Sequence, residues 1–364
     1  MEIKMPVCFY FDLPLEADPI NSYPIMDKKI GVGVIGYGYW GPNLARNFNE
    51  TPGFNLKAIS DLSQQRLDFA KSRYPSIDVF SNYMDLLNDP EIEAVALSTP
   101  THTHFSIGMA ALKAGKHLLV EKPLASSVEQ ARQLTEEAVK QKKVLLVDHT
   151  FIYTGAVRKL RELVEDGSLG KILYYDAVRV NLGLIQQDIN VLWDLAIHDL
   201  AIMDYVLGAH PRAVSATGLA HPGKHESISY ITVFFDDNLI AHVHANWLAP
   251  VKVRRTLLGG TNKMVVYDDV EPSEKIKVYD KGISVSSSVE DVYKMLIQYR
   301  TGDMHAPHIN ASEALRTEIE HFHDCIRKGE KPLTDGAAGI RAIQLLEAAS
   351  LSLKKRGEPI DLNL

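Results

Sequence analysis

An apolar segment followed at once by a glycine-rich turn constrains this chain more than any other feature. Residues 30–35 read Ile-Gly-Val-Gly-Val-Ile, and residues 36–41 read Gly-Tyr-Gly-Tyr-Trp-Gly. Pro42 then stands where the pattern predicts the first turn of a helix. In such a strand–turn–helix, the first glycine permits the tight turn, the second lets the backbone approach a pyrophosphate, and the third lets helix and strand pack closely. The nucleotide-binding residues expected here are Gly36, Gly38, Tyr39, Trp40 and Gly41.

The first half of the chain alternates short β-branched segments with helical ones. This alternation is typical of βαβ units and of a parallel sheet covered by helices on both faces. We therefore predict a Rossmann dinucleotide-binding domain over residues 29–150. The strands expected within it are 30–35, 56–60, 79–80, 94–98, 117–120 and 144–147.

The pattern changes after residue 150. The helices expected there are 156–165, 191–207 (closed by Gly208), 312–328 and 336–354. The expected strands are 174–180, 228–235, 239–247, 252–258 and 263–267. Their alternating pattern favours one antiparallel sheet. We assign residues 151–364 to a second domain, which is expected to bind the substrate.

Residues 1–28 are predicted to be an N-terminal extension. Acidic residues and four prolines interrupt its apolar stretches, which excludes a signal-peptide core. Two interpretations stay open: translation begins at Met26, or the extension packs on a partner subunit.

Composition excludes several classes of partner. The formal net charge is −7 without a basic block, so nucleic acid is a poor candidate. No apolar run reaches the roughly 18 residues that would cross a bilayer. Cys8 and Cys325 are too few for a disulfide framework or a thiolate zinc site. A reduced cytoplasm is the expected location.

Asp61 follows the second strand, twenty residues after Gly41. A carboxylate there can accept hydrogen bonds from the adenosine ribose diol. It favours NAD over NADP, because a 2′-phosphate would meet a negative charge and no arginine adjoins Asp61 in sequence, the nearest being Arg66. The alternative is that the glycines only form turns and that Asp61 only caps a helix.

Polar residues also follow the fourth and fifth strands, where ligands of open parallel sheets bind. Lys122, held between the end of a strand and Pro123, is expected on the nicotinamide side of the crevice. With the glycine turn and Asp61, the expected cofactor-binding residues are Arg66, Ser98, Thr99, Pro100, His104, Glu121 and Lys122.

Asp194 and His198 lie four residues apart on the predicted helix 191–207 and therefore share a face. A carboxylate in that position can orient an imidazole and raise its basicity, as a general base requires. The alternative is a helix-surface ion pair worth a few tenths of a kcal/mol. The otherwise apolar helix favours the catalytic interpretation.

Four motifs in order give the chain its family resemblance: residues 36–41, Thr99-Pro100 with His104, residues 121–123, and Asp194 with His198. Together they resemble the Gfo/Idh/MocA oxidoreductase family from about residue 29 onward. The resemblance implies a Rossmann domain followed by an α/β domain with a large, open, mainly antiparallel sheet. It also implies a homodimer or homotetramer and NAD(P)-dependent oxidation of a secondary hydroxyl on a sugar, inositol or sugar nucleotide.

On this basis we expect His198 to remove the hydroxyl proton, Lys122 to stabilise the developing alkoxide and Asp194 to orient His198. A sugar nucleotide is slightly favoured over a free sugar or inositol, and a non-catalytic NAD-binding sensor or assembly subunit is the alternative. No metal is expected, because His242 and His244 share a strand face without a third ligand nearby. Candidate substrate contacts are Tyr153, Arg179, Asn181 and Asp188.

Overall fold

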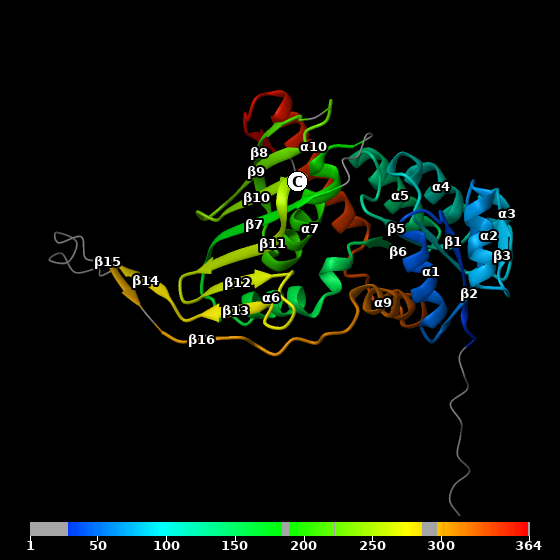
Figure 1. The fold of residues 1–364 in the computed structure, drawn as a ribbon, viewed down its shortest axis with the longest axis horizontal. Helices are drawn as coiled ribbons and strands as arrows, with labels where there is room; N and C mark the ends of the chain where they lie inside the picture. Colours follow the sequence, from blue (N-terminus) through cyan, green and yellow to red (C-terminus); the bar gives the residue numbers. More distant parts are fainter. Residues whose placement is uncertain (1–27, 184–188, 222, 286–296, 301, 363–364) are drawn as a thin grey trace, which may run out of the picture.

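The computed structural model of the protein describes residues 28–183, 189–221, 223–285, 297–300 and 302–362. Two α/β parts lie side by side in Figure 1, the first blue to cyan and the second green to yellow. The predicted N-terminal extension lies outside the described residues, except for Lys28. None of the helices within these ranges is long and apolar enough to cross a membrane.

The first part is a parallel sheet with the strand order β3-β2-β1-β4-β5-β6. Its strands are β1 (Ile30–Ile35), β2 (Phe54–Ser60), β3 (Asp78–Phe80), β4 (Ala94–Leu97), β5 (His117–Glu121) and β6 (Leu145–Asp148). Its helices are α1 (Gly41–Glu50), α2 (Gln64–Arg73), α3 (Tyr83–Leu87), α4 (Thr101–Lys113) and α5 (Val128–Lys140). Every residue of β1 is buried, because helices cover both faces of the sheet. The predicted Rossmann fold is confirmed.

The second part is a mixed, mostly antiparallel sheet with the strand order β16-β13-β12-β11-β7-β10-β9-β8-β17. Its longer strands are β7 (Ile172–Leu182), β8 (Pro211–Leu219), β9 (Ile228–Phe235), β10 (Ile240–Asn246) and β11 (Leu248–Gly260). The shorter ones are β12 (Met264–Asp268), β13 (Ile276–Tyr279), β16 (Met304–His305) and β17 (Ile360–Asp361). The mainly antiparallel sheet is confirmed, but a purely antiparallel one is wrong at β7 and β10, which pair in parallel. A helix and two strands connect them, as a parallel crossover requires.

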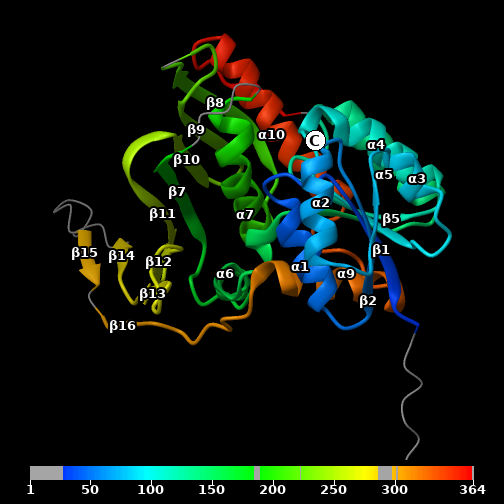
Figure 2. The same cartoon turned by 45° about the vertical axis from the view of Figure 1, so that its right-hand side comes forward.

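Two further strands, β14 (Gly282–Val285) and β15 (Ile297–Arg300), form a separate two-stranded sheet. They project away from the rest of the molecule in both Figure 1 and Figure 2.

His242 is exposed on β10, and the ring of His244 stacks on that of Tyr230 with their centroids 4.4 Å apart. Among the described residues, no group of three or more His, Cys, Asp or Glu side chains is placed to hold a metal ion. The predicted homodimer or homotetramer stays a prediction.

Helices cover one face of the large sheet. They are the 3₁₀ turn η1 (Thr150–Tyr153), α6 (Gly155–Glu165), the π-helical turn η2 (Leu192–Ala196), α7 (Ile197–Leu207) and α10 (Gly336–Lys354). Helix α9 (Ala314–Lys328) packs on the Rossmann sheet instead. The helix expected over 191–207 is present, with its first turn in π geometry. Gly208 ends it in the left-handed conformation, at φ 58°.

Packing crosses the predicted domain boundary at residue 150. Helix α10 contacts α5 of the first part as well as α7 and β8 of the second. Helix α9 places Leu315, Ile319 and Phe322 in the hydrophobic core of the Rossmann sheet. Elements from after residue 150 therefore complete the packing of the first part, and the division into 29–150 and 151–364 stays a prediction.

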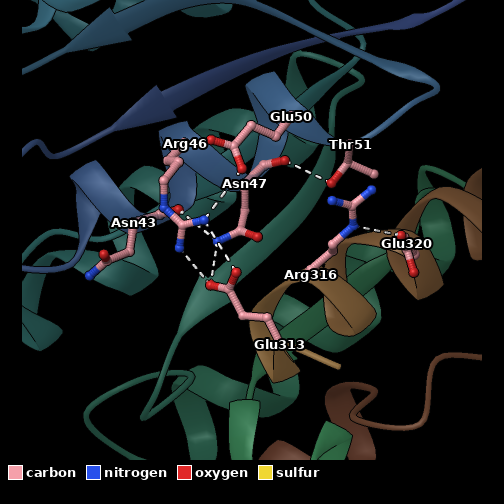
Figure 3. Close-up of polar contacts among 8 residues, drawn as sticks. All are labelled: Asn43, Arg46, Asn47, Glu50, Thr51, Glu313, Arg316 and Glu320. Carbon is pink, nitrogen blue, oxygen red and sulfur yellow. Dashed lines mark hydrogen bonds and ion pairs between the residues drawn. The ribbon is translucent and has the colours of Figure 1, made fainter. Parts of the chain in front are cut away.

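Polar contacts fasten the start of α9 to α1 (Figure 3). The carboxylate of Glu313 accepts hydrogen bonds from Arg46, at 2.5 and 3.2 Å, and from Asn47, at 3.1 Å. Arg46 also lies 3.4 Å from Glu50 on its own helix. The last part of the chain is thus held against the first helix, which positions α9 beside the ends of the Rossmann strands.

Candidate functional site

A cleft of about 1320 Å³ runs along the carboxyl ends of the Rossmann strands. The turn after β1 and the loops after β2, β4, β5 and β6 form one wall, and residues of η2, α7 and β11 form the other. The predicted site residues that line it are Gly36, Gly38, Tyr39, Trp40, Asp61, Arg66, Ser98, Thr99, Pro100, Glu121, Lys122, Asp194 and His198. Residues from both halves of the chain therefore meet around one cavity.

The glycine turn is built for close backbone approach. Gly36 has φ +92°, and a Cβ there would lie 2.6 Å from the carbonyl oxygen of Ser98. A Cβ on Gly41 would lie 2.2 Å from the carbonyl oxygen of Gly36. At Gly38 the nearest atom to such a Cβ is an Arg66 nitrogen at 3.7 Å, so a side chain there would take up cleft space. With α1 beginning at Gly41, the turn fits a dinucleotide pyrophosphate at a helix N-terminus.

Asp61 is fixed at the end of the cleft beside this turn. Its carboxylate accepts hydrogen bonds from the backbone N–H groups of Tyr37, at 2.7 Å, and Ser63, at 2.8 Å. Arg66 Nη1 lies 3.5 Å from Asp61 Oδ2. The expectation that no arginine adjoins Asp61 is therefore wrong in space, because the first turn of α2 brings Arg66 back to it. The carboxylate remains available to a ribose diol.

His104 is a brace behind the cleft wall. Its ring is 1% exposed, with Nδ1 2.8 Å from the carbonyl oxygen of Pro123 and Nε2 2.8 Å from that of Thr99. Burial lowers its pKa. The ring thus ties the loop after β4 to the loop after β5, and it does not line the cavity itself.

Lys122 and Asp194 meet across the cleft. Lys122 Nζ donates to the backbone oxygen of Asp194 at 2.9 Å and lies 3.6 Å from its Oδ1. Trp247 Nε1 donates to Asp194 Oδ2 at 3.0 Å. The pairing of Asp194 with His198 expected from their helical spacing is absent among the described contacts, because Lys122 and Trp247 occupy this carboxylate. Asp194 therefore holds the lysine in place.

His198 projects into the cleft from α7, beside Phe151. Their rings pack edge to face, with centroids 4.9 Å apart at 72°. Burial, and then the charges of Lys122 and Arg179, hold the pKa of His198 well below its usual value. The imidazole is therefore neutral near pH 7, the form in which it can accept a proton.

Three carboxyl groups lie close together at the ends of β5 and β6: Glu121 and Asp148, which line the cleft, and Glu318, which is fully buried. Asp148 ends β6 and accepts hydrogen bonds from Trp40 Nε1, at 2.9 Å, and from the Thr150 hydroxyl. Burial, and then the neighbouring Asp148, raise the pKa values of Glu121 and Glu318 well above the usual range. Both oxygens of Glu318 and Oε1 of Glu121 receive no hydrogen bond from a donor. We infer that both glutamates are protonated.

The three candidate substrate contacts that the structure describes, Tyr153, Arg179 and Asn181, do not line the cavity. Tyr153 is 1% exposed, and its hydroxyl pairs with Thr334 Oγ1 at 3.0 Å. Arg179 is 3% exposed and forms an ion pair with Asp199. Asn181 is half-buried near the end of β7 but does not line the cleft. Asp188 lies outside the described residues. Tyr153 and Arg179 are structural, because each is enclosed by the core of the second part.

Sequence reasoning missed several cleft residues. Asp148 stands at the carboxyl end of a predicted strand, the same signal that identified Lys122. Arg254 lines the cleft from β11 and carries no local motif. Glu318 carries none either; it is fully buried close to Asp148 and does not line the cleft. Arg179 could have been recognised as buried, because it alternates with Tyr175 and Ala177, which are 1% and 0% exposed.

Two family models match the chain. Residues 30–149 match the GFO_IDH_MocA model, described as "Oxidoreductase family, NAD-binding Rossmann fold", and residues 157–266 match the GFO/IDH/MocA C-terminal domain. The UDP-N-acetylglucosamine 3-dehydrogenase of Acidithiobacillus ferrooxidans is 26% identical over 328 residues, or 88% of this chain and 95% of that protein. The myo-inositol 2-dehydrogenase of Thermotoga maritima is 26% identical over 337 residues, covering 89% and 96%.

Solved structures share the fold. GnnA, the UDP-N-acetylglucosamine 3-dehydrogenase from A. ferrooxidans, superposes with a TM-score of 0.77 at 24% identity, covering 90% of this chain and 99% of that one. GenD2 from gentamicin A biosynthesis, in complex with NAD, has a TM-score of 0.78 at 23% identity, covering 93% and 98%.

Proposed function

Because the chain belongs to the GFO/IDH/MocA oxidoreductase family and is an NAD-dependent dehydrogenase by that membership, we propose that it oxidises a secondary hydroxyl of a sugar or sugar nucleotide. The relatives named for UDP-N-acetylglucosamine and for myo-inositol support a polyhydroxylated substrate. They differ in substrate class, so the choice between a sugar nucleotide and a free polyol depends on the cleft of this chain.

The proposal depends on one observation: Lys122 and His198 line the same cleft, although they come from different halves of the chain. Lys122 follows β5 of the Rossmann sheet, on the side where ligands of such sheets bind. His198 faces it from α7. A hydroxyl between them would meet an ammonium donor and a neutral imidazole acceptor.

The residues divide the reaction between them. His198 takes the proton of the reacting hydroxyl, since the lowered pKa keeps its ring neutral. Lys122 donates a hydrogen bond to the same oxygen and stabilises its developing negative charge. Asp194 positions Lys122 through the 2.9 and 3.6 Å contacts described above. NAD, when bound along the glycine turn and Asp61, supplies the hydride acceptor.

A screen for NADH formation tests the proposal. The unmodified protein is assayed with nucleotide sugars, free hexoses and inositols, and NAD affinity is measured separately. Lys122→Ala should lower kcat at least about a hundredfold, the usual loss of one charge-stabilising donor, and should change NAD affinity little. Lys140→Ala is the matched control, because that side chain is 72% exposed on α5 and does not line the cleft.

The outcomes separate two functions. Substrate-dependent NADH formation that Lys122→Ala abolishes and Lys140→Ala preserves supports the dehydrogenase. Tight NAD binding without NADH formation across the whole panel contradicts it and favours a non-catalytic NAD-binding protein.

A further inference from the structure

Two arginines stand directly opposite each other on neighbouring strands of the large sheet. Arg179 on β7 and Arg254 on β11 are register partners in the antiparallel pair. Both guanidinium groups lie over the ring of Phe151, at 4.4 Å for Arg179 and 5.3 Å for Arg254. Like charges placed directly across a sheet are destabilising. Such a pair therefore needs anions close by.

The protein neutralises the inner arginine better than the outer one. Asp199 accepts two hydrogen bonds from Arg179, at 2.5 and 3.1 Å, yet Arg179 Nη1 is buried without a partner. Arg254 Nη1 lies 3.3 Å from Asp269 Oδ2. Lys275 lies 3.8 Å from the other oxygen of Asp269, so this single carboxylate serves two cations.

Asp269 is engaged further by the Tyr267 hydroxyl, at 3.1 Å. Within this group of five contacting side chains, the three cations Arg179, Arg254 and Lys275 thus face the two carboxylates Asp199 and Asp269, which leaves one excess positive charge in the group. That charge is not remote from the chemistry. Arg179 and Arg254 both contribute to the lowered pKa of His198, after burial and Lys122.

Arg254 is the member of the pair that a ligand can reach. It lines the cleft together with Lys122 and His198, and its side chain is 29% exposed. Among the contacts of the described residues, the Arg254 side chain donates one hydrogen bond, to Asp269, and a guanidinium carries five N–H donors. Phe151 packs against both Arg254 and His198, so the guanidinium lies one aromatic ring away from the proposed base.

We propose that the substrate carries an anionic oxygen group, a carboxylate or a phosphate, which binds Arg254 while the reacting hydroxyl lies at Lys122 and His198. This inference rests on the proposed function and names the substrate class within it. A planar guanidinium matches either anion with paired hydrogen bonds. A hexuronic acid would present the carboxylate, and a nucleoside diphosphate sugar would present the phosphate.

Substitutions at adjacent arginines test the assignment. Arg254→Gln removes the charge in the cleft. Arg255→Gln is the matched control, because Arg255 is 55% exposed, does not line the cleft and pairs with Asp268 just as Arg254 pairs with Asp269. Arg254→Lys keeps the positive charge but loses the planar guanidinium that can donate paired hydrogen bonds to one anion. Thermal unfolding of all three variants with NAD shows whether each is folded.

Initial rates are compared for a neutral inositol, a free hexuronic acid and a nucleoside diphosphate hexose. We expect the unmodified protein to prefer one of the two anionic substrates. Arg254→Gln should lower its kcat/KM for that substrate at least tenfold more than for the inositol. Arg254→Lys should lose less, and Arg255→Gln should match the unmodified protein. Preference for the hexuronic acid identifies the anion as a carboxylate, and preference for the nucleoside diphosphate hexose identifies it as a phosphate.

Two results overturn the inference while the proposed function stands: oxidation of neutral substrates in preference to both anionic ones, or an equal loss on neutral and anionic substrates in Arg254→Gln. If Arg254→Gln fails to fold, the test uses inorganic phosphate as an inhibitor of the unmodified protein. Phosphate should then compete with the anionic substrate and not with NAD. A lack of competition overturns the inference. No oxidation of any substrate instead refutes the proposed function itself.

Discussion

Replacing Glu318 with glutamine should make the stability of the protein depend less on pH, because it removes a buried titratable group from the core beside the cleft. Glu318 is fully buried on α9, and neither carboxyl oxygen receives a hydrogen bond. Burial, and then the neighbouring Asp148, raise its pKa well above the usual value. The folded protein therefore keeps a proton on Glu318 at pH values where the unfolded chain has released it. Stability must then fall as the pH rises.

The size of the effect follows from one proton. A difference of one bound proton between the folded and unfolded states changes the free energy of unfolding by about 1.4 kcal/mol per pH unit. The range begins near the unfolded pKa of about 4.3 and extends up to the folded pKa. Glutamine has nearly the same shape and can donate to Asp148 without releasing a proton. Between about pH 5 and pH 7, the free energy of unfolding of Glu318→Gln should rise relative to that of the unmodified protein, by at most about 3 kcal/mol.

Urea unfolding at several pH values measures this difference. Glu320→Gln is the control, because Glu320 is 50% exposed on the same helix and pairs with Arg316 (Figure 3). When the free energy of unfolding is plotted against pH, the slope for Glu318→Gln should differ from that of the unmodified protein by the equivalent of about one proton. The slope for Glu320→Gln should stay close to that of the unmodified protein. Parallel plots for Glu318→Gln and the unmodified protein would falsify the assignment of a buried, protonated Glu318.

Three further substitutions test the cleft. His198→Asn should lower kcat by about 10²–10⁴-fold. It should also abolish the loss of kcat/KM at acidic pH, which in the unmodified protein occurs well below the usual titration range of histidine because the pKa of His198 is lowered; an unchanged pH–rate profile would exclude His198 as the base. Asp61→Ser should weaken NAD binding and strengthen NADP binding, because Arg66, 3.5 Å from Asp61, becomes free for a 2′-phosphate. Fluorescence titration with both nucleotides measures the two affinities, and an unaltered preference for NAD contradicts the prediction. Gly41→Ala should lower the free energy of unfolding by about 1–3 kcal/mol and weaken NAD binding, because its Cβ would lie 2.2 Å from the carbonyl oxygen of Gly36. Calorimetric unfolding with and without NAD measures both effects, and an unchanged Tm would contradict the prediction.

The sequence was most informative where structure is local. The glycine turn, Asp61 and Lys122 each follow a strand directly, so the strand pattern alone brings them to one edge of the sheet. The extent of helix α10 was likewise predicted, since its apolar pattern runs from Gly336 to Lys354 without interruption. These features require no knowledge of distant partners.

The partners of each side chain could not be read in the same way. The spacing of Asp194 and His198 places them on one helix face, but it cannot show that Trp247 and Lys122 claim the carboxylate. Glu318 comes close to Asp148 and Glu121 only because α9 returns to the Rossmann sheet. Arg66 lies five residues from Asp61, and only the bend into α2 brings the two together.

The return of α9 also sets an order for biosynthesis. Phe322 stacks on Phe54 at 6.1 Å, so an aromatic contact in the nucleotide-binding half awaits a residue translated near the end of the chain. A nascent chain that has emerged only as far as Asp148 carries all six Rossmann strands, but it still exposes the apolar surface that α9 will cover. On the ribosome, the part made first is thus among the last to be finished.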